Sequence, residues 1–163
     1  MDEDTIVSIA IIIAILAISA GLINTWLGST GEKRVLSLYI LNERGNADPR
    51  FYPGNVTAGE PFLLYVVVQN DGEEALSLRV DVKVGDLSTP PPSRASPSPL
   101  PTTWTLEFTV PPRGQRTSRL ELTLNETGLD RRVIFELYIL NASGSYRYTG
   151  IWNQLWVNVT APP

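Results

Sequence analysis

The chain of 163 residues contains no cysteine and no histidine. Without cysteine there are no disulfides, no thiol nucleophile and no zinc–thiolate site. Without histidine there is no imidazole for acid–base catalysis near neutral pH. A globular part of about 130 residues can still fold on its hydrophobic core alone. The two absences therefore argue against enzymatic chemistry and leave the cellular compartment open.

The chain also lacks a strong excess of either positive or negative charge. The chain has 13 Lys+Arg and 17 Asp+Glu, and three of the acidic residues are Asp2, Glu3 and Asp4 at the start. The rest is nearly neutral and has no basic face, so we expect no nucleic-acid partner. Paired catalytic carboxylates, calcium-loop spacings and glycine-rich phosphate loops are missing too. We predict a protein that is not an enzyme and that has no cofactor and no metal.

The most prominent feature is the uncharged stretch of 22 residues from Ile6 to Leu27. A bilayer core requires about 20 apolar residues, and a backbone inside lipid must form a helix to satisfy its own polar groups. Trp26 lies at the end, where interfacial aromatic residues collect. We predict a single transmembrane helix over 6–27 after a short acidic N-terminus at 1–5, with membrane lipid as its first partner.

Two alternatives compete for this stretch. A cleaved secretory signal begins with positive charge and has a shorter apolar core, and here the start is acidic. A pilin-like helix, packed in the core of a filament, is the second alternative, although no basic processing site precedes it. In either a membrane or a filament, small residues permit close helix contact: Ala10, Ala14, Ala17, Ala20 and Gly21.

A hinge at 28–33 separates the helix from a region with the pattern of a β-protein. Apolar residues alternate over Arg34–Asn42, most clearly over Leu76–Val84, and again near the C-terminus. Alternating strands also lie at 104–110 and 120–124, and the last strand lies at 151–160. The near-continuous apolar run at 61–70 is typical of a strand covered on both faces, and 132–141 is a further buried strand. Turn signals separate these strands, about seven in all. We predict a mainly β fold, with one immunoglobulin-like antiparallel β-sandwich over 34–163.

The segment 85–103 interrupts this pattern. It holds six prolines among serines and threonines, which predicts an extended, semi-rigid loop inside the domain. The strands on either side need each other to cover their apolar faces, so the loop does not divide two domains. It is either a plain surface excursion, which we favour, or a site of O-linked sugar.

Four sequons of the form Asn-X-Ser/Thr occur, at Asn55, Asn125, Asn141 and Asn158. They predict N-linked glycans and place the β domain outside the cell. Lys33 and Arg34 favour the opposite orientation, because basic residues usually mark the cytoplasmic side. Glu32 lies beside this pair, so we give the sequons more weight.

Several segments resemble the DUF1616 family. Its opening pattern is similar to Tyr39-Ile40-Leu41, Tyr52-Pro53, Asn55–Pro61 and Val66–Asn70. Its closing strands are similar to Pro111–Gly114, Phe135–Tyr138, Tyr146-Arg147 and Leu155–Val159. The resemblance spans Val35 to Thr160 and implies an archaeal, membrane-associated protein with an extracytoplasmic immunoglobulin-like domain. The single hydrophobic helix and the proline-rich insertion depart from that family.

Together these features predict a single-pass, glycosylated cell-surface protein of the cell membrane, with its β domain extracellular. Its role would be adhesion, envelope organisation or assembly, with other surface or membrane proteins or copies of itself as partners. The alternative is a pilin-like subunit of an extracellular filament.

Overall fold

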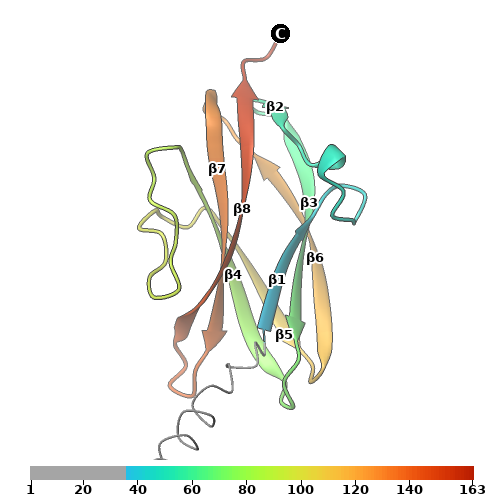
Figure 1. Ribbon diagram of the computed structural model, residues 1–163, viewed down its shortest axis with the longest axis vertical. Coiled ribbons are helices and arrows are strands. Elements are labelled where there is room, and N and C mark those ends of the chain that lie inside the picture. Colours follow the sequence, from blue (N-terminus) through green and yellow to red (C-terminus); the bar gives the residue numbers. More distant parts are fainter. Residues whose placement is uncertain (1–35) are drawn as a thin grey trace, which may run out of the picture. The chain divides into compact units, whose positions relative to one another are not determined.

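A computed structural model describes residues 36–163, which form eight β-strands and one short helical turn (Figure 1). The strands are β1 Leu36–Leu41, β2 Asn55–Thr57, β3 Pro61–Asn70, β4 Leu76–Gly85, β5 Trp104–Val110, β6 Gly114–Thr123, β7 Gly128–Leu140 and β8 Tyr146–Thr160. The 3-10 turn η1, Pro49–Phe51, lies between β1 and β2. The predicted transmembrane helix at 6–27 and the hinge at 28–33 lie outside the described residues.

The strands form two sheets, one of three strands in the order β1-β3-β6 and one of five in the order β2-β8-β7-β4-β5. All pairings are antiparallel except that of β2 with β8. The chain crosses between the sheets from β1 to β2, from β2 to β3, from β3 to β4, from β5 to β6 and from β6 to β7. This is the Greek-key connectivity of immunoglobulin-like sandwiches. The predicted mainly β sandwich is confirmed.

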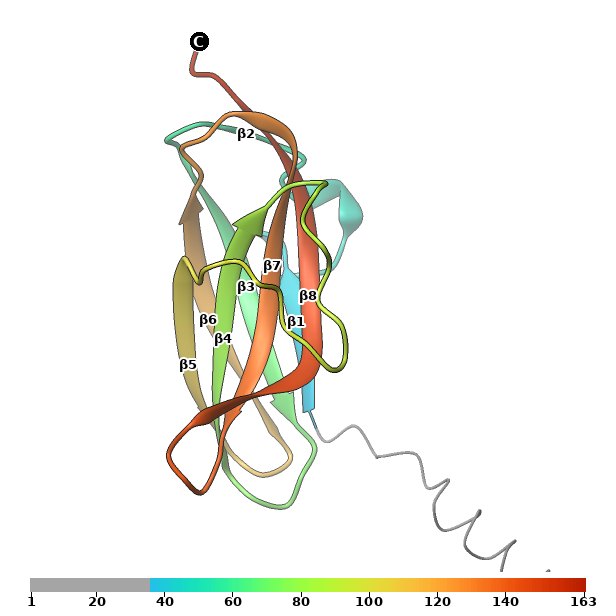
Figure 2. The same cartoon turned by 90° about the vertical axis from the view of Figure 1, so that its left-hand side faces the viewer.

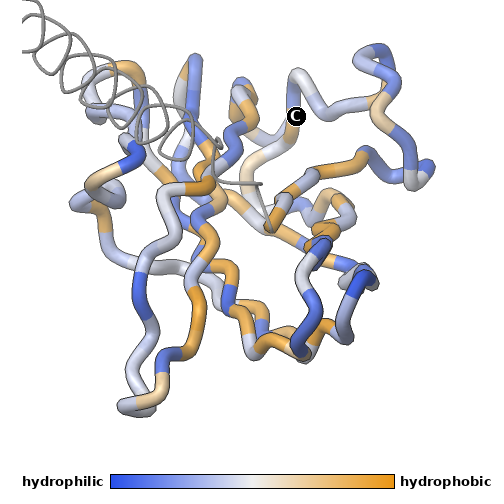
Figure 3. The backbone as a smooth tube through the Cα atoms, turned by 60° about the horizontal axis from the view of Figure 1, so that its bottom comes forward, coloured by the Kyte–Doolittle hydropathy of each residue, from blue (hydrophilic) through white to orange (hydrophobic). Residues whose placement is uncertain are grey.

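The core lies between the two sheets and follows directly from the alternation in the sequence (Figure 2). Leu64, Val66 and Val68 of β3 face Leu78, Val80 and Val82 of β4, and all six are fully buried. Phe135 is the largest fully buried side chain. Hydrophobic residues follow the strands, whereas the loops are mainly hydrophilic (Figure 3). Burial of this apolar surface is the main stabilising term of the domain.

The register defines two ends of the sandwich. Leu36, which pairs with Asn70, lies at one end with the β3–β4 turn and the β7–β8 hairpin. The β6–β7 turn and the C-terminus lie at the opposite end, where β2 pairs with the last residues of β8. The described domain therefore begins at one end and finishes at the other.

Strand β2 and the first residues of β6, β7 and β8 were not predicted. Strand β2 has only three residues, and β6 begins at Gly114 rather than Leu120. Residues 115–119 carry no apolar alternation because Arg116 and Ser118, the positions opposite the core-facing Val68 and Val66, are polar, but their backbone pairs with β3 from Tyr65 to Gln69. Within residues 36–163 the structure contains no helix with the length and apolarity that crossing a membrane requires.

Candidate functional site

The proline-rich loop between β4 and β5 folds back across the outer face of the five-stranded sheet (Figure 2). This arrangement buries Asp81 and Lys83 of β4 and Glu136 of β7, which would otherwise face solvent. The alternation over β4 predicted a half-buried strand. Its second half is instead covered on both faces, by the core on one side and by the loop on the other.

Glu136 is the centre of this buried cluster. Its Oε2 lies 2.8 Å from Lys83 Nζ and accepts a hydrogen bond of 2.9 Å from the Tyr138 hydroxyl. Its Oε1 accepts a hydrogen bond from the backbone N–H of Ser98, in the loop. Lys83 Nζ also donates to the Ser98 carbonyl, at 2.7 Å. One loop residue is therefore held by both members of a buried ion pair.

The contacts of this cluster indicate a role in holding the fold together. Burying two charges is expensive, and the cost is repaid only when the pair is close and its remaining hydrogen-bonding groups are satisfied. Both carboxylate oxygens of Glu136 have partners inside the domain. The pair therefore fixes the loop to the sheet.

A second ion pair flanks the first. Arg79 contacts both carboxylate oxygens of Asp81, with its Nε 2.9 Å from Oδ1 and its Nη2 2.9 Å from Oδ2. The Arg79 guanidinium also lies 4.4 Å from the ring centroid of Tyr146. Of the two contacts with Asp81, only the Nη2 contact has the geometry of a hydrogen bond, and the Nε contact is a close pairing of opposite charges. Arg79 thus connects Asp81 on the outer face of β4 with Tyr146 at the β7–β8 hairpin.

Three more contacts hold the loop. Arg132 Nη1 donates to the Thr89 carbonyl at 2.8 Å, and the Tyr148 hydroxyl donates to the Ser93 carbonyl at 3.0 Å. Gly150 lies so close to the loop that a Cβ there would be 2.5 Å from the Arg94 carbonyl oxygen. The loop is thus attached to β4, β7 and β8.

Burial raises the pKa of Tyr148 to about 12, and the nearby Glu136 charge adds to this shift. The pKa of Tyr138 is also well above its ordinary value, first because of burial and then because its hydroxyl donates to Glu136. Both effects disfavour a tyrosinate beneath the loop.

Alkaline pH is therefore expected to destabilise the domain. A tyrosine in the unfolded chain ionises near pH 10. Between that pH and about 12 the unfolded chain releases protons from Tyr138 and Tyr148 that the folded chain retains, so stability falls as pH rises. Urea unfolding at a series of pH values, with tyrosinate absorbance, measures this. Tyr148→Phe removes one of the two contributions and should flatten the decline; an unchanged decline would contradict the assignment to Tyr148.

Sequence reasoning missed this cluster, although one signal was present. Glu136 is the only charged residue in the apolar run from Val133 to Leu140. A single carboxylate inside such a strand requires a buried partner, because an unpaired buried charge is very costly. The identity of that partner depends on the β4–β7 register, which places Lys83 opposite Ile134, next to Glu136.

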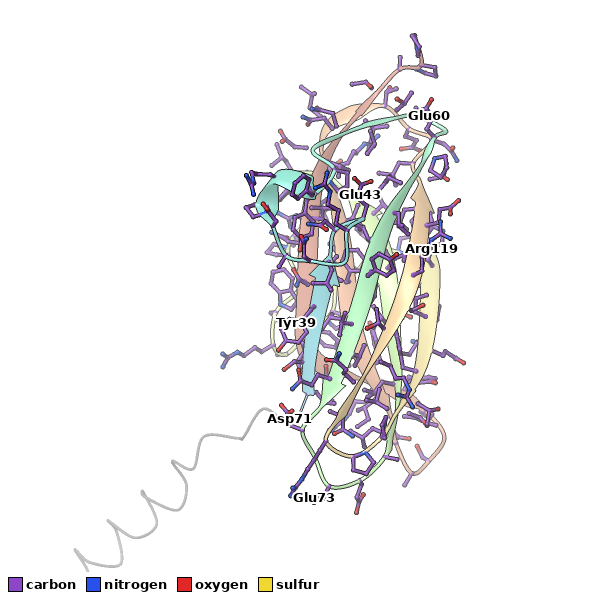
Figure 4. The ribbon with its side chains drawn as sticks, turned by 90° about the vertical axis from the view of Figure 1, so that its right-hand side faces the viewer. Tyr39, Glu43, Glu60, Asp71, Glu73 and Arg119 are labelled. Carbon is purple, nitrogen blue, oxygen red and sulfur yellow. The ribbon has the colours of Figure 1, made fainter. Side chains whose placement is uncertain are left out.

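The outer face of the three-stranded sheet is different, because no loop from the described residues 36–163 covers it (Figure 4). A shallow hollow there is lined by Tyr39, Leu41, Gly45, Tyr65, Val67, Gln115 and Thr117. Tyr39 on β1 is 46% exposed, whereas Val67 beneath it is buried. Arg119 on β6 lies at the opposite edge of this sheet from Tyr39 (Figure 4). The face combines an uncharged, aromatic centre with a polar rim.

The four sequons occupy different settings. Asn55 in β2 and Asn158 in β8 are brought together, with Asn158 Nδ2 3.1 Å from Asn55 Oδ1. Asn125 lies in the β6–β7 turn at the same end of the sandwich. Asn141 lies in the β7–β8 hairpin, at the end where the described domain begins. The predicted helix-packing residues at positions 10, 14, 17, 20, 21 and 26 lie outside the described residues.

Within residues 36–163 no group of three or more acidic side chains is placed to hold a metal ion.

Comparisons with known proteins give a fold and no family. No protein-family model and no curated protein matches the chain. Among solved structures, it is similar to the C-terminal domain of Wzt, at 9% identity and a TM-score of 0.50, over 79% of this chain and 75% of that one. At that identity the similarity shows the fold alone.

Two further structures are similar at TM-scores below 0.5. One is a CARDB domain from Pyrococcus furiosus in complex with di-metal ions, at 12% identity and a TM-score of 0.47, over 77% of this chain and 87% of that one. The other is a β-glucosidase from Listeria innocua, at 14% identity and a TM-score of 0.46. The chain covers 16% of that enzyme's length, with 78% of its own residues matched.

Proposed function

We propose that the protein is a membrane-anchored, glycosylated interaction module of the cell surface. The uncharged segment 6–27 would hold it in the lipid bilayer, and the β-sandwich would bind other surface or membrane proteins, or further copies of itself. Adhesion, envelope organisation and assembly with membrane partners all use such a module.

The observation that carries the proposal is the open face of the three-stranded sheet. Its hollow is lined by two tyrosines, two aliphatic residues, a glycine and the uncharged polar residues Gln115 and Thr117, with no charged side chain in its lining. Interface centres are depleted in charge and enriched in tyrosine, and their rims are polar. The other sheet has its outer face covered by the chain's own loop, so the open face is the better candidate for binding.

The filament alternative uses the same fold differently. The segment 6–27 would then pack against its copies in a filament core, and the sandwich would decorate the outside. Small residues such as Ala14 and Gly21 suit that packing as well as they suit contacts between membrane helices.

The experiment exploits the absence of cysteine, because a single introduced thiol is a unique label. Tyr39→Cys places it in the hollow, and Ala95→Cys places it on the exposed part of the proline-rich loop, on the other sheet. In intact cells, both are expected to react with a membrane-impermeant maleimide. A photo-crosslinker attached to the thiol is expected to give a discrete adduct from position 39 and none from position 95.

The outcomes distinguish the membrane anchor from the filament subunit. Labelled protein that stays with membranes until detergent is added supports the anchor. Labelled protein that is sheared from cells and sediments as long particles supports the filament. Failure of both thiols to react in intact cells would contradict an extracellular domain, and equal adducts from both positions would contradict the hollow as the docking face.

A further inference from the structure

Two of the four sequons face each other across neighbouring strands. Strand β2 runs parallel to β8, so that Asn55 lies beside Asn158. Asn158 Nδ2 donates to Asn55 Oδ1 at 3.1 Å, and Asn158 Oδ1 accepts from the Asp130 N–H at 3.0 Å. The Asp130 contact fixes which side of the Asn158 amide carries nitrogen. At Asn158 the nitrogen that would receive a sugar is therefore already engaged, whereas Asn55 contributes only its side-chain oxygen and is held by the β2–β8 pairing of its backbone.

The backbone around Asn158 is engaged as well. Its N–H donates to the Gly54 carbonyl at 2.9 Å, and β8 pairs here with β2 on one side and β7 on the other. A transferase must bind the acceptor segment in an extended loop, so Asn158 is accessible only after the end of β8 detaches from both neighbours. The free energy of local opening ranges from near zero at fraying termini to that of global unfolding in core strands, and pairing with two neighbouring strands raises it for the end of β8 above that of the exposed turns.

The other two sequons are open. Asn125 lies in the β6–β7 turn with its side chain exposed, and within residues 36–163 that side chain makes no hydrogen bond. Asn141 is exposed in the β7–β8 hairpin. Its Oδ1 accepts from the N–H groups of Ser143 and Ser145, whereas its Nδ2 donates to no group in the described domain. In both residues the nitrogen that would carry the sugar makes no hydrogen bond within residues 36–163.

We infer that Asn125 and Asn141 are the glycan acceptors, and that Asn55 and Asn158 form an amide lock that fastens β2 to β8 and stays unmodified. The inference rests on the proposed extracellular location for its biological setting. The two acceptors lie at opposite ends of the sandwich, at the β6–β7 turn and the β7–β8 hairpin. Neither lies on the strands that form the hollow, so glycans would leave that face free to bind.

The first test needs no assumption about location. The full chain, purified unmodified in detergent, is incubated with an oligosaccharyltransferase that recognises Asn-X-Ser/Thr and its lipid-linked sugar donor. Glycopeptide mass mapping then gives the occupancy at each sequon. We expect Asn125 and Asn141 to be occupied, and Asn55 and Asn158 to be at least about tenfold less occupied, because their strands must open first.

Two controls make the result specific. A synthetic peptide of residues 148–163 carries the Asn158 sequon without the fold and should be modified readily. Asn125→Gln and Asn141→Gln should each remove one glycan mass from the folded chain, and the double variant should remove both. Occupancy of Asn158 in the folded chain equal to that of Asn125 would overturn the inference, as would absence of sugar from both Asn125 and Asn141.

Protein from its native source then separates the inference from the proposed function. Glycans at Asn125 and Asn141 alone support both. A glycan at Asn158 or Asn55 overturns the inference and leaves the extracellular location intact. A further outcome is native protein that carries sugar at no sequon, while the transferase modifies only Asn125 and Asn141 in vitro. That result would count against the extracellular location, and the inference about the Asn55–Asn158 pair would still hold.

Discussion

Replacing Glu136 with alanine is expected to lower the free energy of unfolding by about 3–5 kcal/mol, as for other broken buried ion pairs. The truncation leaves Lys83 Nζ, the Ser98 N–H and the Tyr138 hydroxyl without their carboxylate acceptor. Urea unfolding of the full chain in detergent, followed by circular dichroism and tryptophan fluorescence, measures the loss.

The matched control removes both charges together. A Lys83→Met, Glu136→Leu double variant fills similar volume and leaves neither member of this pair as an unpaired charge, so it should lose less than half as much, under about 2 kcal/mol. Glu136→Gln retains the shape and one acceptor, and should fall between the two. Equal losses for Glu136→Ala and the double variant would show that packing, rather than the unpaired lysine, dominates.

Gly150→Ala is expected to cost about 2–4 kcal/mol, from two separate sources. The residue has φ +76°, where a side chain is strained, and its new Cβ would meet the Arg94 carbonyl at 2.5 Å. That neighbour is backbone, so the proline-rich loop must move as a unit. Displacement of the loop exposes Tyr148, whose pKa should then fall from about 12 toward its ordinary value.

Gly144 supplies the control, because it has φ +79° but no atom within 4 Å of an added Cβ. Gly144→Ala should therefore cost only the backbone term, about 1–2 kcal/mol, with no change at Tyr148. The difference between the two variants isolates the contact with the loop. If the variants lose equal stability, the close approach of Arg94 to Gly150 contributes nothing measurable.

The strands predicted best are those with a strong apolar signal, which is a near-continuous run in β3 and an alternation in β4 and β5. The predicted ranges 61–70 and 104–110 coincide with β3 and β5, and 76–84 misses only the last residue of β4. Strand β8 begins at Tyr146 rather than Ile151, because Arg147 lacks the apolar signal while its backbone pairs with Ile139 of β7. Hydrophobic periodicity identifies a strand that has a buried face, but it does not identify a strand segment that is held only by backbone hydrogen bonds.

The contacts that could not be predicted from the sequence are those between residues far apart in the chain, because they depend on which strands pair and in which register. In the sequence, nothing shows that the proline-rich loop covers Lys83 and Glu136. Ser98, the loop residue that contacts both, is 38 residues from Glu136. The Asn55–Asn158 pair joins residues 103 positions apart. The sequons were recognisable one by one, but their division into a locked pair and two open sites required the parallel β2–β8 pairing. The membrane segment and the extracellular location stay predictions.

The position of β1 determines how the domain would carry mechanical tension. Its six residues pair with β3 from Leu36–Asn70 to Leu41–Tyr65, antiparallel and along the long axis of the sandwich. Antiparallel hydrogen bonds lie perpendicular to their strands. A pull applied at Leu36 along that axis therefore loads all of these bonds at once, in shear, rather than opening them one after another. If a partner is seated over Tyr39 and Tyr65, the force passes from β1 to β3 within one sheet, and the buried charges beneath the proline-rich loop stay outside its path.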